Sequence, residues 1–412
     1  MLLNFKRYIY SVLVFFIVFA FPFLPFLNSA RIVVLYILML FLLTNSIGKN
    51  MRYFSDHFSH FTFIYYLVFL YTFGITVIWM AYDWSLTSRV ISSFLLYFIS
   101  FSFFRYASQY VKVEKVVVYC FVVQSAIIII SIFSESVFTL LEPFRKVDEA
   151  RELTYGRLRG NAVSGYQFFG ISTMFTFVII YLIIHLKEFR YGSLCLMLLC
   201  VAGITSGRFS VVGIMIGFGA LLWQKVVNRK LGKVLWICFA LTLVIIILVF
   251  LLYQYVDDIS DPLMYKVVSD YLIAPIDSIL MGGSFESDST NYLMYMYDKD
   301  DIKQYFVWGS GRFESENGGY FGGVDIGYYR MLGYYGVFGF LLVTYAFYYL
   351  IYRTRSNLDL YTKHAFFINF LVLNLKGDVQ IFNNNIVPIL VAFLFFCATE
   401  QKKKVIIHKE LR

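Results

Sequence analysis

Arginine is the residue type in this chain whose placement most suggests chemistry, because several arginines lie beside long apolar runs. They occur in the segments RLRGNAVSG, TSGRFS, WGSGRFESENGG and GYYRMLGYYG, as Arg157, Arg159, Arg208, Arg312 and Arg330. A guanidinium group stays charged at working pH, and its planar fork of donors matches phosphate oxygens. The five residues are therefore candidate ligands of a lipid pyrophosphate. The alternative for each is an anchor at the membrane interface or a partner for nearby acids.

The elements that must position these arginines are predicted to be membrane helices. The 412-residue chain is 60% hydrophobic and 15% charged, with a mean hydropathy of +0.70. A soluble fold of this size could not bury that much apolar surface. Apolar runs of roughly 17–25 residues indicate twelve spans. They lie near residues 8–27, 32–48, 61–82, 90–104, 116–133, 167–186, 192–206, 209–224, 234–255, 328–352, 365–377 and 385–399.

We therefore expect an all-α, polytopic membrane protein that forms a single domain over residues 1–412. The last two spans are short and flank polar residues, so a re-entrant pair is the alternative there. The apolar run at 8–27 is too long for a cleaved signal peptide and is predicted to remain as the first span.

The distribution of charge predicts the orientation of these helices. With the amino terminus in the cytoplasm, 21 of the 35 Lys and Arg residues fall on the cytoplasmic face and 20 of the 26 acids on the other. That asymmetry follows the positive-inside rule and places both termini in the cytoplasm, with anionic inner-leaflet lipid as a partner. Two long loops, 134–166 and 256–327, then lie on the outer face. The net charge of +9 is explained by topology, and no pattern typical of nucleic-acid binding accompanies it.

The outer face carries carboxylates but no histidine, since all five histidines fall in cytoplasmic segments or near the inner end of a span. A general base there must then be a carboxylate. The second long loop ends in a glycine-rich segment that offers Asp325, Glu314 and Glu316. The five cysteines lie in apolar runs without ligand spacing, so we expect no metal site, and no soluble cofactor motif is present.

Three segments of the chain resemble the Wzy-type O-antigen and capsular polysaccharide polymerases, of the superfamily that includes the O-antigen ligases. Residues 157–170 are similar to an outer-loop arginine segment that leads into a span, and residues 205–214 to a serine-arginine turn. Residues 308–340 resemble the family's glycine-rich outer loop, which is followed by a span with spaced glycines. Asp325 occupies the register in which ligases typically carry a histidine, which favours a polymerase.

The resemblance implies a metal-independent glycosyl transfer at the outer face of the bacterial cytoplasmic membrane, with undecaprenyl-pyrophosphate-linked oligosaccharides as substrates and without a cofactor. The arginines would hold the pyrophosphate, and Asp325, Glu314 or Glu316 would activate the acceptor hydroxyl. A chain-length regulator and a flippase of the same pathway are the protein partners that the resemblance suggests. A ligase and a transporter or flippase of lipid-linked sugars are the alternative functions.

Overall fold

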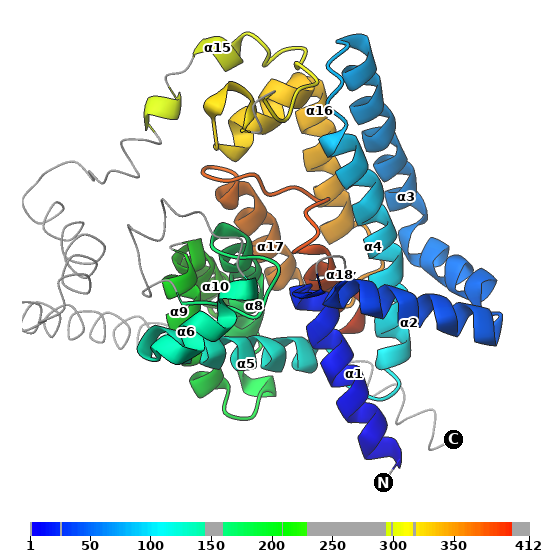
Figure 1. The fold of residues 1–412 in the computed structure, drawn as a ribbon, viewed down its shortest axis with the longest axis vertical. Helices are drawn as coiled ribbons and strands as arrows, with labels where there is room; N and C mark the ends of the chain where they lie inside the picture. Colours follow the sequence, from blue (N-terminus) through cyan, green and yellow to red (C-terminus); the bar gives the residue numbers. More distant parts are fainter. Residues whose placement is uncertain are drawn as a thin grey trace, which may run out of the picture.

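The computed structural model describes residues 2–24, 27–144, 160–207, 209–228, 294–297, 300–315 and 319–397, and these residues are almost entirely helical (Figure 1). In chain order the first half contains α1 (Leu2–Phe19), β1 (Pro22–Leu24), β2 (Leu27–Asn28), α2 (Ser29–Thr44), α3 (Ile47–Ile78), α4 (Ser85–Ala107), α5 (Val113–Phe133), α6 (Glu135–Leu141) and η1 (Glu142–Phe144). The second half contains α8 (Phe169–Ile184), η3 (Leu186–Glu188), α9 (Gly192–Ser206), α10 (Phe209–Val227), α15 (Asp300–Lys303), η5 (Phe321–Gly323), α16 (Gly327–Tyr352), α17 (Leu360–Leu373) and α18 (Val387–Phe396).

The expectation of a helical membrane protein is confirmed at the level of helix type and composition. Among the described residues five helices are long and apolar enough to cross a membrane: α3, α4, α5, α10 and α16. Shorter apolar helices are α2, α8, α9, α17 and α18. Each predicted span within the described residues overlaps a helix, although the span predicted at 8–27 runs beyond Phe19, where α1 ends. The predicted span at 234–255 lies outside the described residues, as do residues 145–159 of the first long loop and most of the second.

Within the described residues the chain departs from the all-helical expectation in a short hairpin, in which β1 pairs antiparallel with β2 and Pro22 lies opposite Asn28. The hairpin connects α1 to α2. Proline lacks an amide donor and cannot continue a helix, which explains why α1 ends before Pro22. The side chain of Asn28 then caps α2 by accepting a hydrogen bond from the backbone of Arg31 at 2.9 Å.

The core of the bundle is built around α8, whose residues 171–183 are all buried. Its closest neighbour is α10, which approaches through small residues. A Cβ added at Gly213 would lie 2.7 Å from the Cα of Thr176, and one at Gly217 would lie 2.8 Å from the side chain of Ile183. Small residues at such interfaces let helix backbones approach closely when lipid supplies no hydrophobic driving force.

α17 and α18 are joined by a buried segment, residues 374–386, that is mostly irregular. Its polar side chains supply the hydrogen bonds that a helix would otherwise provide. Asn374 donates to the carbonyls of Phe370 and Val379 at 2.9 and 2.7 Å, and Asn385 donates to the carbonyl of Gly170 at 3.0 Å. Irregular backbone at membrane depth is tolerated where protein surrounds it.

The helices α3, α4 and α16 stand side by side on one flank of the molecule, with α17 and α18 between them and α8–α10 (Figure 1). One end of this bundle is where α3 and α17 end and where α4, α16 and α18 begin. We call it the Arg330 end, after the buried arginine in the first turn of α16.

At the opposite end a histidine joins two carboxylates. His185 lies 3.0 Å from Glu188 through Nδ1 and 3.0 Å from Asp359 through Nε2, and it stacks on Tyr181. Burial disfavours the imidazolium, but the hydrogen bonds to Asp359 and Glu188 outweigh burial and raise the pKa of His185 to about 9. Burial likewise opposes the Asp359 carboxylate, yet hydrogen bonds from His185 and Thr362 lower its pKa to about 2.

We expect His185→Gln to remove a pH-dependent part of the stability. A folded pKa raised from about 6.5 to about 9 corresponds to about 3 kcal/mol at roughly 1.4 kcal/mol per pKa unit. This contribution is fully present below pH 6.5 and is lost as the pH rises through 9. Thermal unfolding in detergent at pH 6 and pH 9.5 measures it: the wild type should lose stability between the two values and the variant should not. An equal loss in both proteins would contradict the prediction.

Candidate anion-binding site

The Arg330 end is organised by a break in α16. Gly336 has φ +68° and ψ −179°, a conformation that L-residues avoid, and the helical hydrogen bonds are interrupted there. The carbonyls of Gly333 and Tyr334 instead accept hydrogen bonds from the backbone of Ser310 at 2.8 Å and of Gly311 at 3.2 Å. A Cβ at Gly336 would collide with the carbonyl of Val307. The segment that contains Ser310 and Gly311 therefore packs against α16 at the break that Gly336 makes in the helix.

The residues that follow, Arg312 to Glu314, are fixed to the turn between α3 and α4. The carboxylate of Asp83 accepts hydrogen bonds from the backbone amides of Phe313 and Glu314, the latter at 2.8 Å. It also accepts hydrogen bonds from the amide and hydroxyl of Ser85. Burial opposes ionisation of Asp83, but these hydrogen bonds outweigh burial and lower its pKa. Asp83 is thus held as an anion whose oxygens are occupied by donors.

Arg330, in the first turn of α16, is the most deeply buried arginine of the site, with 8% of its surface exposed. Its guanidinium carbon lies 4.0 Å from the centroid of the Phe313 ring and 3.9 Å from that of Tyr320. Such stacking is favourable by about 0.5–2 kcal/mol for each ring. The Nε atom is buried and has no hydrogen-bond partner among the described residues. A buried donor left unpaired costs about 1–3 kcal/mol, so Arg330 is poised to bind an acceptor.

A second arginine, Arg89 near the start of α4, lies in the same place. Its guanidinium lies over Phe313 at 4.9 Å and 3.9 Å from Glu314. Both Arg89 and Arg330 lie 3.9 Å from the same oxygen of Asp378, whose side chain is 5% exposed. A distance of 3.9 Å exceeds hydrogen-bond range, so this carboxylate orients both guanidinium groups without using their donors. Asp378 thus lies near both cations and Glu314 lies near Arg89, so the two guanidinium groups face two carboxylates.

Three arginines gather in this part of the structure, which makes it a candidate site for an anion. Arg89 and Arg330 both approach the carboxylate of Asp378, and Arg312, exposed beside Phe313, adds a third cation. Among the described residues no group of three or more His, Cys, Asp or Glu side chains could hold a metal ion. Preorganised donors of this kind stabilise a phosphate or pyrophosphate whose negative charge grows as a bond to it breaks.

The structure brings part of the predicted site together. Arg330 stacks on Phe313, and Glu314 lies 3.9 Å from Arg89. Arg312 directly precedes Phe313 in the chain. Asp325 lies in the turn before α16, half-buried, where its backbone amide donates to the sulfur of Met296 at 3.4 Å. Its role as the base stays a prediction. The remaining predicted residues lie outside the described residues: Arg157, Arg159, Arg208 and Glu316.

Three residues of the cluster were missed by the sequence analysis: Arg89, Asp83 and Asp378. A signal existed for Arg89, because an arginine just inside the start of an apolar helix has the same setting as Arg330. Asp83 and Asp378 lie in short turns that carry no motif. Only the packing of α3, α4, α16 and the α17–α18 segment brings them to one point.

A scan against protein-family models, a search of curated proteins and a search of solved structures each gave no match to this chain.

Proposed function

We propose that this protein polymerises undecaprenyl-pyrophosphate-linked oligosaccharide repeat units, as the resemblance to Wzy-type polymerases implies. The observation that carries the proposal is the convergence of Arg89 and Arg330 on Asp378, with a buried unpaired donor on Arg330. A membrane protein needs such a cluster to hold a strongly charged lipid head group at the membrane boundary.

The topology that accompanies the proposal has twelve spans, both termini in the cytoplasm and the Arg330 end on the outer face of the cytoplasmic membrane. The helix ends that meet at the Arg330 end are all ones that the charge distribution assigns to the outer side. The neighbouring helices are compatible with this arrangement, since Gly170 at the start of α8 contacts Asn385 near the start of α18.

In the proposed reaction the growing glycan moves from its pyrophosphate carrier to a sugar hydroxyl of the incoming lipid-linked unit. The bond between the sugar anomeric carbon and the pyrophosphate oxygen breaks, and a bond from that carbon to the acceptor oxygen forms. Arg330, Arg89 and Arg312 neutralise the undecaprenyl pyrophosphate that leaves. The acceptor proton passes to a carboxylate, with Asp325 as the first candidate and Glu314 and Glu316 as the others.

The decisive test is incubation of the purified protein with a lipid-linked repeat unit, followed by gel analysis of the product. A ladder of polymer supports a polymerase. In cells, loss of a polymerase should leave single repeat units on the surface lipid, whereas loss of a flippase leaves none and loss of a ligase leaves polymer unattached. Either of the last two phenotypes would replace the proposal with the corresponding alternative.

We expect Arg312→Ala to reduce long-chain product at least tenfold, because it removes one cation from the exposed rim of the site. Arg31→Ala is the matched control, since Arg31 is also exposed and lies in the first turn of α2. Polymer ladders and membrane protein levels should be compared for both variants. A normal ladder from Arg312→Ala would remove Arg312 from the mechanism.

A further inference from the structure

Gln380 is a buried polar side chain beside the arginine cluster, and the proposed reaction gives it no role. It lies in the irregular segment between α17 and α18 and is fully buried. Its Nε2 atom donates a hydrogen bond to Oδ1 of Asp378. Its Oε1 atom accepts a hydrogen bond from the hydroxyl of Tyr335 at 3.3 Å. Because the Tyr335 hydroxyl occupies Oε1, the amide nitrogen of Gln380 faces Asp378 and the orientation of the amide is fixed.

The other oxygen of Asp378 faces the two arginines. Oδ2 lies 3.9 Å from a terminal nitrogen of Arg89 and 3.9 Å from a terminal nitrogen of Arg330. A charge-assisted hydrogen bond between such groups is about 2.7–2.9 Å long, so the carboxylate stops about 1 Å short of bonding to either guanidinium. An arginine that donated to Asp378 would have fewer donors left for another anion. The position of this carboxylate therefore decides how many donors the cluster can offer.

The backbone around Asp378 is held by hydrogen bonds from two directions. The side chain of Asn383 donates to the carbonyl of Asp378 at 2.8 Å. The hydroxyl of Tyr97, on α4, donates to the carbonyl of Ile381 at 2.9 Å. Rotation of the Asp378 side chain is therefore the movement that would bring its carboxylate onto the arginines.

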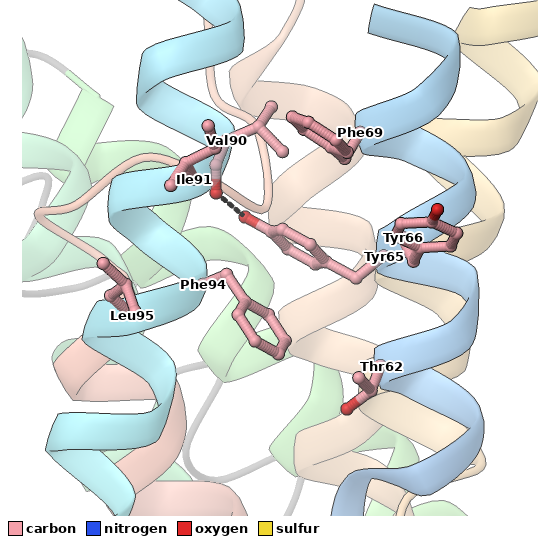
Figure 2. Close-up of a pocket in the computed structure, with 8 residues that line it drawn as sticks. All are labelled: Thr62, Tyr65, Tyr66, Phe69, Val90, Ile91, Phe94 and Leu95. Atoms are coloured by element: carbon pink, nitrogen blue, oxygen red, sulfur yellow. Dashed lines mark hydrogen bonds between the residues drawn. The ribbon is translucent and has the colours of Figure 1, made fainter. Parts of the chain in front are cut away.

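The arginines are held in place as well. Figure 2 shows Tyr65 on α3 beside Val90 on α4, and the Tyr65 hydroxyl donates to the carbonyl of Val90 at 3.1 Å. Val90 is buried and directly follows Arg89, so this bond fixes α4 to α3 at the arginine. Arg330 lies over the ring of Phe313, with its guanidinium carbon 4.0 Å from the ring centroid. The carboxylate opposite them is the part of the cluster that a side-chain rotation can rearrange.

We propose that Gln380 is a positioning residue of the anion site, which holds Asp378 back from Arg89 and Arg330 and so keeps their donors available. Through its bond to Oδ1, Gln380 opposes the rotation that would carry Oδ2 onto an arginine. Without that bond, the attraction between a carboxylate and a guanidinium would close the gap and form a hydrogen bond between them. Gln380 acts on the ligand through Asp378 alone. The inference rests on the proposed function for taking a pyrophosphate as the ligand.

The test measures binding of inorganic pyrophosphate to the purified full-length protein by calorimetry. Gln380→Met keeps most of the side-chain volume and removes the donor to Asp378, so we expect it to bind pyrophosphate about tenfold more weakly. Thermal unfolding checks that the variant folds. If it does not fold, Gln380→Asn takes its place, because the shorter amide does not reach Asp378 and the same weakening is expected.

Asn385→Leu is the matched control. Asn385 is also buried in the segment between α17 and α18, and it also donates one hydrogen bond, to the carbonyl of Gly170 at 3.0 Å. It makes this contact away from the arginines. We expect the variant to bind pyrophosphate within about twofold of the wild type, even if it lowers the unfolding temperature.

A second background distinguishes positioning from a structural role. In Asp378→Asn the charge that Gln380 restrains is absent, so adding Gln380→Met should change pyrophosphate affinity by less than about twofold. Equal weakening by Gln380→Met with and without the Asp378 charge would overturn the inference. Wild-type affinity in a folded Gln380→Met or Gln380→Asn protein would overturn it as well.

The polymerisation assay separates this inference from the proposed function. Pyrophosphate binding that depends on Gln380, in a protein that forms no polymer, supports the positioning role and rejects the polymerase. Polymer formation by a wild type that does not bind pyrophosphate supports the polymerase and overturns the role of Gln380.

Discussion

Arg330→Gln is expected to reduce polymer formation by at least 100-fold, the largest loss from any single side chain of the site. The guanidinium lies between the rings of Phe313 and Tyr320 and shares Asp378 with Arg89. Glutamine keeps part of the volume but loses the charge and the stacking, and a 100-fold loss corresponds to about 2.7 kcal/mol of transition-state stabilisation. Because Arg89 still pairs with Asp378, the buried carboxylate is not left alone and the fold should persist.

Arg330→Lys sharpens this prediction, because lysine keeps the charge and loses the planar fork. If Arg330 acts by bidentate contact with a pyrophosphate, the lysine variant should recover less than one tenth of the wild-type rate. Its affinity for inorganic pyrophosphate should fall in parallel. Arg353→Gln is the control, since Arg353 caps the opposite end of the same helix. Full activity in Arg330→Lys would show that binding needs the charge of residue 330 and not its planar fork. Full activity in Arg330→Gln would show that Arg330 does not bind the pyrophosphate.

The helices could be predicted from the sequence because backbone groups in an apolar setting must be paired within the segment. The apolar runs therefore indicated α4, α5 and α16 near their observed positions, whereas α3 begins at Ile47, well before the start predicted at residue 61. Boundaries were less accurate where a polar segment is buried. α17 and α18 are 14 and 10 residues long, and the predicted spans there ran over part of the irregular segment between them. Its asparagines satisfy the backbone through tertiary contacts that no local pattern indicates.

The candidate site was predictable in residue type but only partly in its membership. Arg312 and Arg330 stand out in the sequence since they flank a glycine-rich segment and an apolar run. The role of Gly336 was not predictable in detail, because its positive φ matters only where the chain at Val307 passes through the break in α16. Asp83 and Asp378 are short polar side chains in turns, and their function depends on segments more than 200 residues apart meeting at Phe313.

Asp83→Asn is expected to weaken the site without removing any group that touches the substrate. The carboxylate of Asp83 accepts hydrogen bonds from the amides of Phe313, Glu314 and Ser85. An asparagine offers one acceptor oxygen and turns an NH₂ donor toward amide donors, so the segment carrying Arg312 should loosen. We expect polymer formation to fall about 30-fold, chiefly through a higher KM for the lipid-linked unit, with Asp83→Glu partly restoring it.

The pH dependence and a double-mutant cycle distinguish this positioning role from a general loss of stability. The folded pKa of Asp83 is lowered from an unfolded value of about 3.9. Its stabilising contribution is therefore present above that pH and is lost only as the pH falls through the lowered folded value. The defect of Asp83→Asn should accordingly be constant between pH 5 and 8.

Combining Asp83→Asn with Arg312→Ala should add less than threefold to the loss caused by Arg312→Ala alone, because Asp83 acts through the segment that holds Arg312. Fully multiplicative losses would mean that Asp83 and Arg312 act independently, and the turn between α3 and α4 would then have no part in presenting that arginine.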